Sequence, residues 1–425
     1  MKALMNKHAM IAVAVLLIVM YALAPRVWIS GTTIVTPSRG GTLTVRLTGW
    51  GAVASFQAVG VVIEEPGMML TYYGVWSDTE CDGDFTPPWH KFRSSITRLV
   101  VKEGVTDIGP MAFADLSELK SATIPGSVAE ISVKMFDKCT SLMSVTIKDG
   151  VTSIQYDAFA QCERLEFITI PNSVKKIGQG AFYKSGLTSV TIPSSVTSFS
   201  PFVFAKSIRL TSVIIEDGVP EIGTKAFSGC TSLLSIMIPN SVISIEDGAF
   251  DSCTSMLSIT IPNSVTSISR SAFTNCTSLI SIDVDDDNIR YRSVNGVLFN
   301  KVIDDVIRYP SNKQGAYTIP HGVVAIGNCE FLGSIGLTSV TIPSSVKWLG
   351  KGAFSGCTSI ASIISLGAVP PATLITYPDE NCYALDSIPS NVCLYVPQNS
   401  ISSYRDSDLW GRYKCIKPIS AIGGS

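Results

Sequence analysis

The chain has 425 residues, of which only 16% are charged, and its formal net charge at pH 7 is −2. This near-neutral balance offers no basic field that would attract nucleic-acid phosphates, so we expect no nucleic-acid partner. Ser, Thr, Ile and Val are abundant, and 33 Gly and 22 Pro interrupt them. Such a composition predicts short β-segments separated by turns rather than long helices.

Residues 1–30 predict a signal peptide or an N-terminal membrane anchor. Basic residues precede the apolar run Ala9–Ala24, as in an export signal. The small residues Ala22–Ala24 resemble a cleavage site, but Pro25 would follow the cut and hinder it. The apolar run is short for a full membrane span, although the residues after it can extend it. The two interpretations predict a protein that is either anchored at the cell surface through this segment or secreted into the extracellular medium.

A β-rich N-terminal cap is expected at 31–95, and a repeat region follows at 96–365. Within the repeat region, phenylalanines recur every 23 residues, with one interval of 22. The consensus of a unit is LTSVTIPxSVTSIGxxAFxxCTS, and the decapeptide LTSVTIPSSV occurs twice without change. The recurring phenylalanines are Phe113, Phe136, Phe159, Phe182, Phe204, Phe227, Phe250, Phe273, Phe331 and Phe354.

Each unit predicts one coil of a solenoid. In Leu187–Ile192 the L-x-x-V-x-I spacing points three apolar side chains inward, and Pro193 ends the strand because it has no N–H group. The SVTSI segment predicts a second wall, and G-x-x-A-F-x-x-C predicts a turn and a short helical piece whose Phe fills the core. A single coil cannot bury its apolar face. We therefore predict a β-rich solenoid of about eleven stacked coils with parallel β-sheet.

One unit is irregular, because Phe273 and Phe331 are 58 residues apart, two periods plus twelve. This predicts an interrupted repeat at about 285–315. The acidic run Asp283–Asn288 has oxygen ligands in the number that calcium needs, but it lacks the glycine and the glutamate of an EF-hand loop. A solvated loop is the default interpretation, and a terminal cap is expected at 366–425.

The consensus resembles the BspA-like leucine-rich repeat family of cell-surface and secreted proteins, through IPxSV, AF and CTS at fixed offsets. The segment Gly41–Ala52 is similar to the β-rich cap before such arrays, and Val294–Pro310 to the interrupted repeat of the family. Leu394–Trp410 is similar to its terminal unit. The resemblance implies extracellular display and binding of a protein or matrix ligand, not a reaction.

Six of the eleven cysteines lie three residues after a recurring phenylalanine, so they occupy equivalent positions in their coils. Equivalent residues of neighbouring coils should lie about 4.8 Å apart, farther than the Cβ separation that a disulfide prefers. We predict a ladder of buried thiols, each a weak donor beside a backbone carbonyl. Cys81, Cys382, Cys393 and Cys415 lie outside this ladder, and the last three are close enough in sequence for one bridge.

The sequence offers little for catalysis. The histidines are His8, His90 and His321, and His321 falls on an exposed turn of a repeat. There is no nucleophile elbow, phosphate-binding glycine loop or pair of zinc-ligating histidines. We therefore predict a protein that is not an enzyme and needs no cofactor or metal.

The outward face of the first strand is rich in Ser and Thr, with an apolar exception. Leu234, Met237, Leu257 and Ile280 should form one contiguous patch on this face. Such a patch is typical of an interaction site for a protein or surface partner, unless the insertion after Asp285 covers it. Both outcomes stay open.

Two further hypotheses differ in the partner that they require. In the first, the Ser/Thr rows and exposed aromatics such as Phe167 and Trp348 bind a glycan. In the second, the array is a structural spacer without a specific partner.

Overall fold

The computed structural model describes residues 93–422 except 95, 102, 374–383 and 386–387, together with five earlier strands. The predicted export segment 1–30 therefore lies outside the described residues, as do Cys81, His90 and Cys382. Within the described part, no helix has the length and apolar character needed to cross a bilayer.

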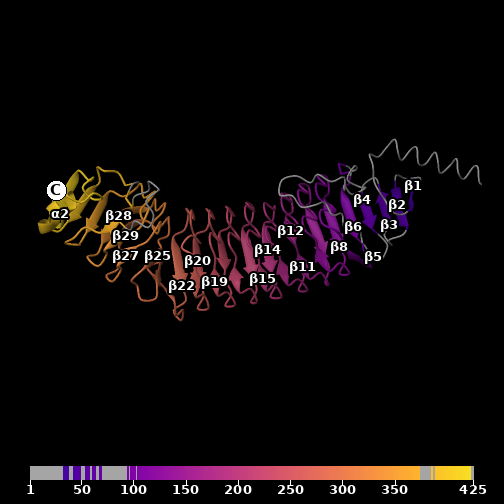
Figure 1. Cartoon of the computed structure of the whole chain (residues 1–425), viewed down its shortest axis with the longest axis horizontal. Helices are drawn as coiled ribbons and strands as arrows, with labels where there is room; N and C mark the ends of the chain where they lie inside the picture. Colours follow the sequence, from indigo (N-terminus) through magenta and orange to yellow (C-terminus); the bar gives the residue numbers. More distant parts are fainter. Residues whose placement is uncertain are drawn as a thin grey trace, which may run out of the picture.

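The coils stack into a gently curved rod, with the N-terminal strands at one end and the C-terminal helix at the other (Figure 1). The solenoid has about 13 turns, slightly more than the eleven predicted. The difference arises partly at the C-terminal end, where strands of the predicted cap continue the parallel stacking.

The first wall of the rod is built from the L-x-x-V-x-I segments. Its side chains alternate, so that Val190 and Ile192 are buried while Ser189 and Thr191 face solvent. Neighbouring strands pair in parallel, in three successive sheets. The strands are β6 (Arg98–Val101), β8 (Ser121–Ile124), β10 (Ser144–Ile147), β12 (Phe167–Ile168), β14 (Ser189–Ile192), β16 (Ser212–Ile215), β18 (Ser235–Met237), β20 (Ser258–Ile261), β22 (Ser281–Val284), β26 (Gly315–Thr318), β28 (Leu337–Ile342), β30 (Ser362–Ser365), β32 (Cys393–Val396) and β33 (Cys415–Pro418).

The second wall consists of shorter parallel strands, most of them two residues long, from the predicted SVTSI segments. Its strands are β7 (Val105–Asp107), β9 (Glu130–Ile131), β11 (Ser153–Ile154), β13 (Lys176–Ile177), β15 (Ser198–Phe199), β17 (Glu221–Ile222), β19 (Ser244–Ile245), β21 (Ser267–Ile268), β27 (Ala325–Ile326), β29 (Trp348–Leu349) and β31 (Ala372–Thr373).

Antiparallel strands precede the coils. The strands β1 (Thr32–Pro37), β2 (Thr42–Thr48), β3 (Val53–Gln57) and β4 (Gly60–Ile63) pair in sequence order, and β4 then pairs in parallel with β6. A further short strand, β5 (Gly67–Met68), pairs with β7. The antiparallel strands thus join the first wall directly.

The third side of each coil differs from the prediction. The G-x-x-A-F-x-x-C segment forms consecutive turns, and the prediction of a short helical piece there is wrong. In one coil, Lys134 and Lys138 have φ angles of 52° and 59°, which an α-helix does not contain. The N–H groups of Lys134, Phe136 and Lys138 donate to carbonyls of the next coil over 2.8–2.9 Å. Hydrogen bonds between coils therefore replace those that a helix would make within itself.

The recurring phenylalanines form a continuous stack inside the rod. From Phe113 to Phe273 the centroids of adjacent rings lie 5.2–5.7 Å apart, and most ring planes are within a few degrees of parallel. The predicted thiol ladder lies beside this stack. Cys139 Sγ donates to the carbonyl oxygen of Phe113 over 3.1 Å, and the other five ladder thiols repeat this contact. The prediction of free, buried thiols beside carbonyls is confirmed.

The interrupted repeat forms an antiparallel hairpin of β23 (Tyr291–Val294), β24 (Val297–Asn300) and β25 (Val306–Arg308). It separates two hydrophobic cores, and its alternating side chains contribute to both. Leu298 packs into the first core and Val297 into the second. Asn288 is fully buried, and its side-chain amide donates hydrogen bonds to the carbonyl oxygens of Pro262 and Val265. These bonds connect the hairpin to the preceding coil.

Charged side chains also bridge the two cores. Arg270, from the first core, contacts the carboxylates of Asp305 in the hairpin region and Glu330 in the second core. Glu330 is only 1% exposed, and its Oε2 has no hydrogen-bond donor among the described residues. Burial therefore raises the pKa of Glu330 to about 8, although the contact with Arg270 acts in the opposite direction.

The C-terminal end closes the second core with Trp410 and Tyr404, both fully buried. The helical segments here are η2 (Gln398–Ser400), α2 (Ile401–Arg405) and η3 (Ile419–Ala421). Cys393 and Cys415 are register partners on β32 and β33, with Cα atoms 4.6 Å apart, and form a disulfide. Strand spacing alone therefore does not prevent register partners from bridging. The ladder thiols differ in that each is directed at a carbonyl.

Candidate functional site

The outward face of the first wall carries three columns of side chains along the rod. Serines dominate one column, from Ser121 on β8 to Ser281 on β22, and strand pairing holds them in register. One flanking column holds mostly threonine, such as Thr146 and Thr191. The other flanking column is mixed, with Lys120, Met143 and Glu166 ahead of Thr188 and Thr211.

Apolar side chains interrupt both flanking columns between β16 and β22. In one column the N–H of Leu257 donates to the carbonyl of Leu234 over 3.2 Å, and that of Ile280 to Leu257 over 2.9 Å. In the other column, Ile214 and Met237 are direct register partners. We call these five residues the strand-face patch. Ile214 and Met237 lie on β16 and β18 of the five-stranded sheet β14 to β22, and Leu234, Leu257 and Ile280 directly precede β18, β20 and β22 of the same sheet.

The strand-face patch is open to solvent. Met237 is 81% exposed, and Ile214, Leu234, Leu257 and Ile280 are 48–57% exposed. The hairpin insertion, which the sequence left as a possible cover, therefore does not cover these side chains. Whether the patch binds a partner stays a prediction.

Ile214 belongs to the patch but was missed from the sequence. The sequence could have revealed it, because Ile214 occupies the same repeat position as Met237, which is held by Thr191 and Thr260 in neighbouring coils. Ile214 and Met237 are adjacent because the parallel register pairs them across β16 and β18.

The two aromatic residues proposed for glycan binding do not share a surface. Phe167 lies on β12 of the first wall and is 59% exposed, in the column otherwise occupied by serines. Trp348 lies on β29 of the second wall and is 45% exposed. These two side chains therefore cannot stack on one sugar chain bound to a single wall.

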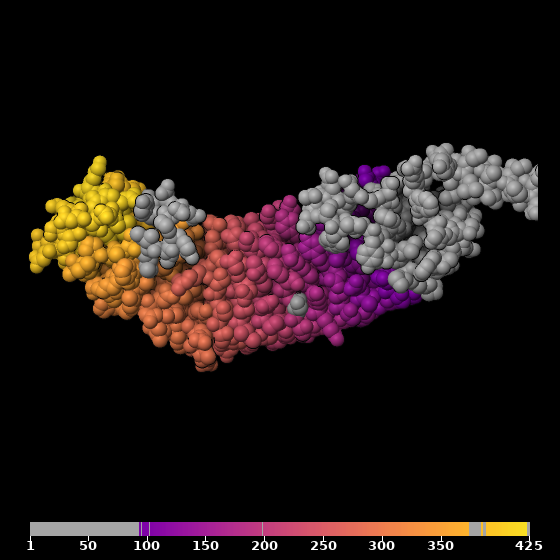
Figure 2. All heavy atoms as spheres, in the orientation of Figure 1, coloured from indigo at the N-terminus to yellow at the C-terminus, as the bar shows by residue number. Residues whose placement is uncertain are grey.

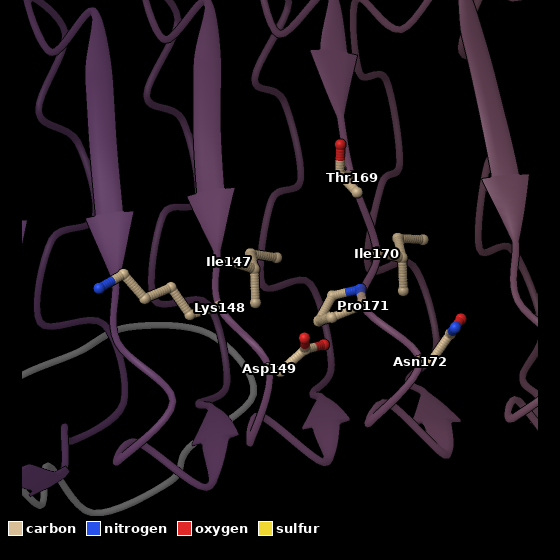
Figure 3. Close-up of a pocket in the computed structure, with 7 residues that line it drawn as sticks. All are labelled: Ile147, Lys148, Asp149, Thr169, Ile170, Pro171 and Asn172. Atoms are coloured by element: carbon tan, nitrogen blue, oxygen red, sulfur yellow. The ribbon is translucent and has the colours of Figure 1, made fainter.

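A shallow hollow of about 600 Å³ lies where β12 ends early (Figure 3). The strand stops at Ile168, and the chain from Thr169 to Asn172 separates from the neighbouring coil at Ile147–Asp149. The labelled side chains line an open depression of mixed character, with one lysine and one aspartate (Figure 3). Figure 2 shows a continuous outer surface along the coils rather than a deep cleft.

The repeat region matches a known protein family. The model of the BspA type leucine rich repeat region (6 copies) matches residues 91–210, 197–314 and 301–404. The chain belongs to this BspA-type leucine-rich repeat family.

A solved structure shares the fold of this BspA-type chain. A leucine-rich cell surface protein from Faecalibacterium prausnitzii aligns with a TM-score of 0.50 and 24% identity, over 92% of this chain and 96% of that one. A leucine-rich repeat protein from Bacteroides ovatus aligns with a TM-score of 0.45 and 20% identity, over 89% and 97%. No curated protein matched the sequence.

The ionisable groups of the BspA-type coils are placed for stability rather than reaction. Burial raises the pKa of Cys230 and Cys276 to about 12, so these thiols stay protonated and are poor nucleophiles. His321 is exposed on its turn, as predicted. Asp285, Asp286 and Asp287 are exposed as well, and no cluster suited to a metal ion exists within the described ranges.

Proposed function

We propose that this BspA-type protein is displayed at the cell surface or secreted, and binds another protein through the strand-face patch. The observation that carries the proposal is the exposure of five large apolar side chains on, or directly before, adjacent strands of a single sheet. Exposed apolar side chains grouped in this way are typical of an interaction site.

The strand-face patch combines apolar and hydroxyl groups, as protein interfaces do. The serines of the middle column, such as Ser235 and Ser258, lie between the two apolar columns and can hydrogen-bond to a partner. Covering the exposed half of Leu234 or Leu257 would contribute about 1 kcal/mol each to binding. The unbranched Met237 can adapt to the shape of a partner.

Three observations support an extracellular location. The disulfide between Cys393 and Cys415 is typical of oxidising compartments. The apolar run Ala9–Ala24 has the features of an export signal. The structural relative from Faecalibacterium prausnitzii is described as a cell surface protein.

The proposal is tested by the double variant Leu234→Asp and Leu257→Asp, which places two charges in the centre of the patch. The matched control is Thr123→Asp and Thr146→Asp, which adds the same charges to the outward face of β8 and β10. Pull-down from native cell extract and medium should recover a partner with the wild type and the control, but not with the patch variant. Equal recovery by all three proteins would contradict the proposal.

A further inference from the structure

Five lysines occupy backbone positions in the turns that favour glycine. Lys134, Lys138, Lys184, Lys206 and Lys225 have φ angles of 52–59°. A positive φ is uncommon for any residue other than glycine, and lysine has no special preference for it. The equivalent positions of other coils are filled by Gly180, Gly229, Gly248, Gly352 and Gly356. Asp157, Gln161 and Ser252 also occupy such positions, with φ angles of 52–60°, so the turn accepts many residue types. What distinguishes the lysines is the aromatic rings beside them.

Aromatic rings lie between these lysines. Lys134 Nζ is 5.6 Å from the ring centroid of Tyr156, and both Lys184 and Lys206 lie over Tyr183, at 5.5 and 5.8 Å. Lys225 Nζ lies 5.7 Å from the ring of Phe202. The rings are half-buried, so each presents one face with ammonium groups above it. We call the five lysines and three rings the lysine–aromatic surface.

The positive charge of this surface is not neutralised by ion pairs. Within the described ranges, none of the five lysines lies within ion-pair distance of a carboxylate. Asp137, whose pKa burial raises to about 6, attracts Lys134 and Lys138, and the half-buried Asp157 attracts Lys134, so the charge of these two lysines is partly compensated. The basic character ends at the coil after Lys225, which carries Glu246, Asp247 and Asp251.

The backbone holds the lysine–aromatic surface rigidly. The N–H of Lys184 donates to the carbonyl of Ala205 over 2.9 Å, and the N–H of Lys206 donates to Ser228 over 2.7 Å. Successive coils therefore present their side chains at a fixed spacing of about 4.8 Å. A preformed row of charges and rings needs little reorganisation when it binds an extended ligand.

We propose that the lysine–aromatic surface binds an acidic polysaccharide, a linear chain of carboxylated or sulfated sugar rings. The ammonium groups would move from the ring faces to pair with the acidic substituents, and the apolar face of a sugar ring would pack on the aromatic rings in their place. The five coils span about 20 Å, the dimension of a short extended oligosaccharide. The inference does not depend on the strand-face patch.

The test measures binding of the full chain to immobilised polygalacturonate and chondroitin sulfate, with neutral dextran as the reference. The variant replaces Lys184, Lys206 and Lys225 by glutamine, which Gln161 shows to be compatible with this backbone, since its φ is 58°. The apparent affinity for at least one acidic polymer should fall about tenfold or more. The control Lys175→Gln, Lys176→Gln and Lys347→Gln, with the same charge change on exposed lysines elsewhere, should bind as the wild type does.

A second variant separates sugar binding from general attraction of polyanions. Tyr183→Leu keeps every lysine and removes one ring, and should weaken polysaccharide binding while hardly changing the binding of inorganic polyphosphate, a polyanion without rings. The proposal is overturned if neither acidic polymer binds the wild type, or if both triple variants lose equal affinity. It is also overturned if polyphosphate binds as tightly as the polysaccharides and Tyr183→Leu changes nothing. Circular dichroism of every variant verifies the fold, and the wild-type affinity must fall as salt rises.

Discussion

The phenylalanine stack predicts a difference between an interior ring and a terminal one. Phe227 is fully buried, and its ring lies 5.6 Å from both Phe204 and Phe250. Phe227→Ala removes a buried ring that the rigid coils cannot replace, so we expect the free energy of unfolding to fall by about 4–5 kcal/mol. Phe273 is as well buried but stacks on one described neighbour in the series, Phe250, at 5.7 Å.

An aromatic pair contributes about 1 kcal/mol beyond its buried area. Phe227 also lies 5.9 Å from the ring of Phe199, so it makes two aromatic pairs more than Phe273 does. Phe273→Ala should therefore cost about 2 kcal/mol less than Phe227→Ala. Urea unfolding followed by far-ultraviolet circular dichroism measures both, and because both rings belong to the first core, the same transition is compared. Equal losses, or a loss below about 2 kcal/mol for Phe227→Ala, would refute the idea that the ring stack stabilises the coils.

Three further predictions concern cysteines and a buried carboxyl. Burial and a pKa of about 12 should protect Cys230 from iodoacetamide in the native protein, and its modification without unfolding, detected by peptide mass spectrometry, would contradict this. Cys393→Ala and Cys415→Ala together should lower the unfolding free energy by about 2–4 kcal/mol, seen as a lower melting temperature, since the bridge closes a loop with a separation of 22 residues. The raised pKa of Glu330, about 8 against 4.5, means that the folded state binds more protons in this interval, so stability should decrease as pH rises from 4.5 to 8. The slope of melting temperature against pH should flatten in Glu330→Gln, and an unchanged slope would disprove the assignment.

Much of the solenoid was predictable because its core repeats. The 23-residue spacing of the phenylalanines and the cysteines three residues after them determined the coil, the inward side chains and the buried thiols. A repeat that must stack on its neighbours leaves few alternatives for apolar residues in equivalent positions. The interrupted repeat was located for the same reason, because Phe273 and Phe331 break the period.

The turns were not predictable from the pattern. In G-x-x-A-F-x-x-C, apolar residues three apart fit a helix as well as a series of turns. The choice is made by hydrogen bonds to the next coil, such as that from the N–H of Phe136 to Ala158. A sequence does not display the sign of φ at Lys134 or Lys138, so the lysine–aromatic surface was missed for the same reason.

The candidate site was predicted in part. Leu234, Met237, Leu257 and Ile280 lie on the outward face where the repeat register placed them, and the structure adds Ile214. Whether the insertion covered them depended on the path of the hairpin, which no repeat pattern specifies. The covering loop could therefore be dismissed only from the exposure of the side chains.

The central claim, that the strand-face patch contacts a partner protein, is tested most directly by site-specific photo-crosslinking. A photoreactive amino acid replaces Met237, the most exposed member of the patch, and in a second protein it replaces Thr146, on the same face of β10. On irradiation with native cells and medium, the Met237 probe should yield a discrete crosslinked protein that the Thr146 probe does not. No crosslink at Met237, or the same products from both positions, would contradict the account.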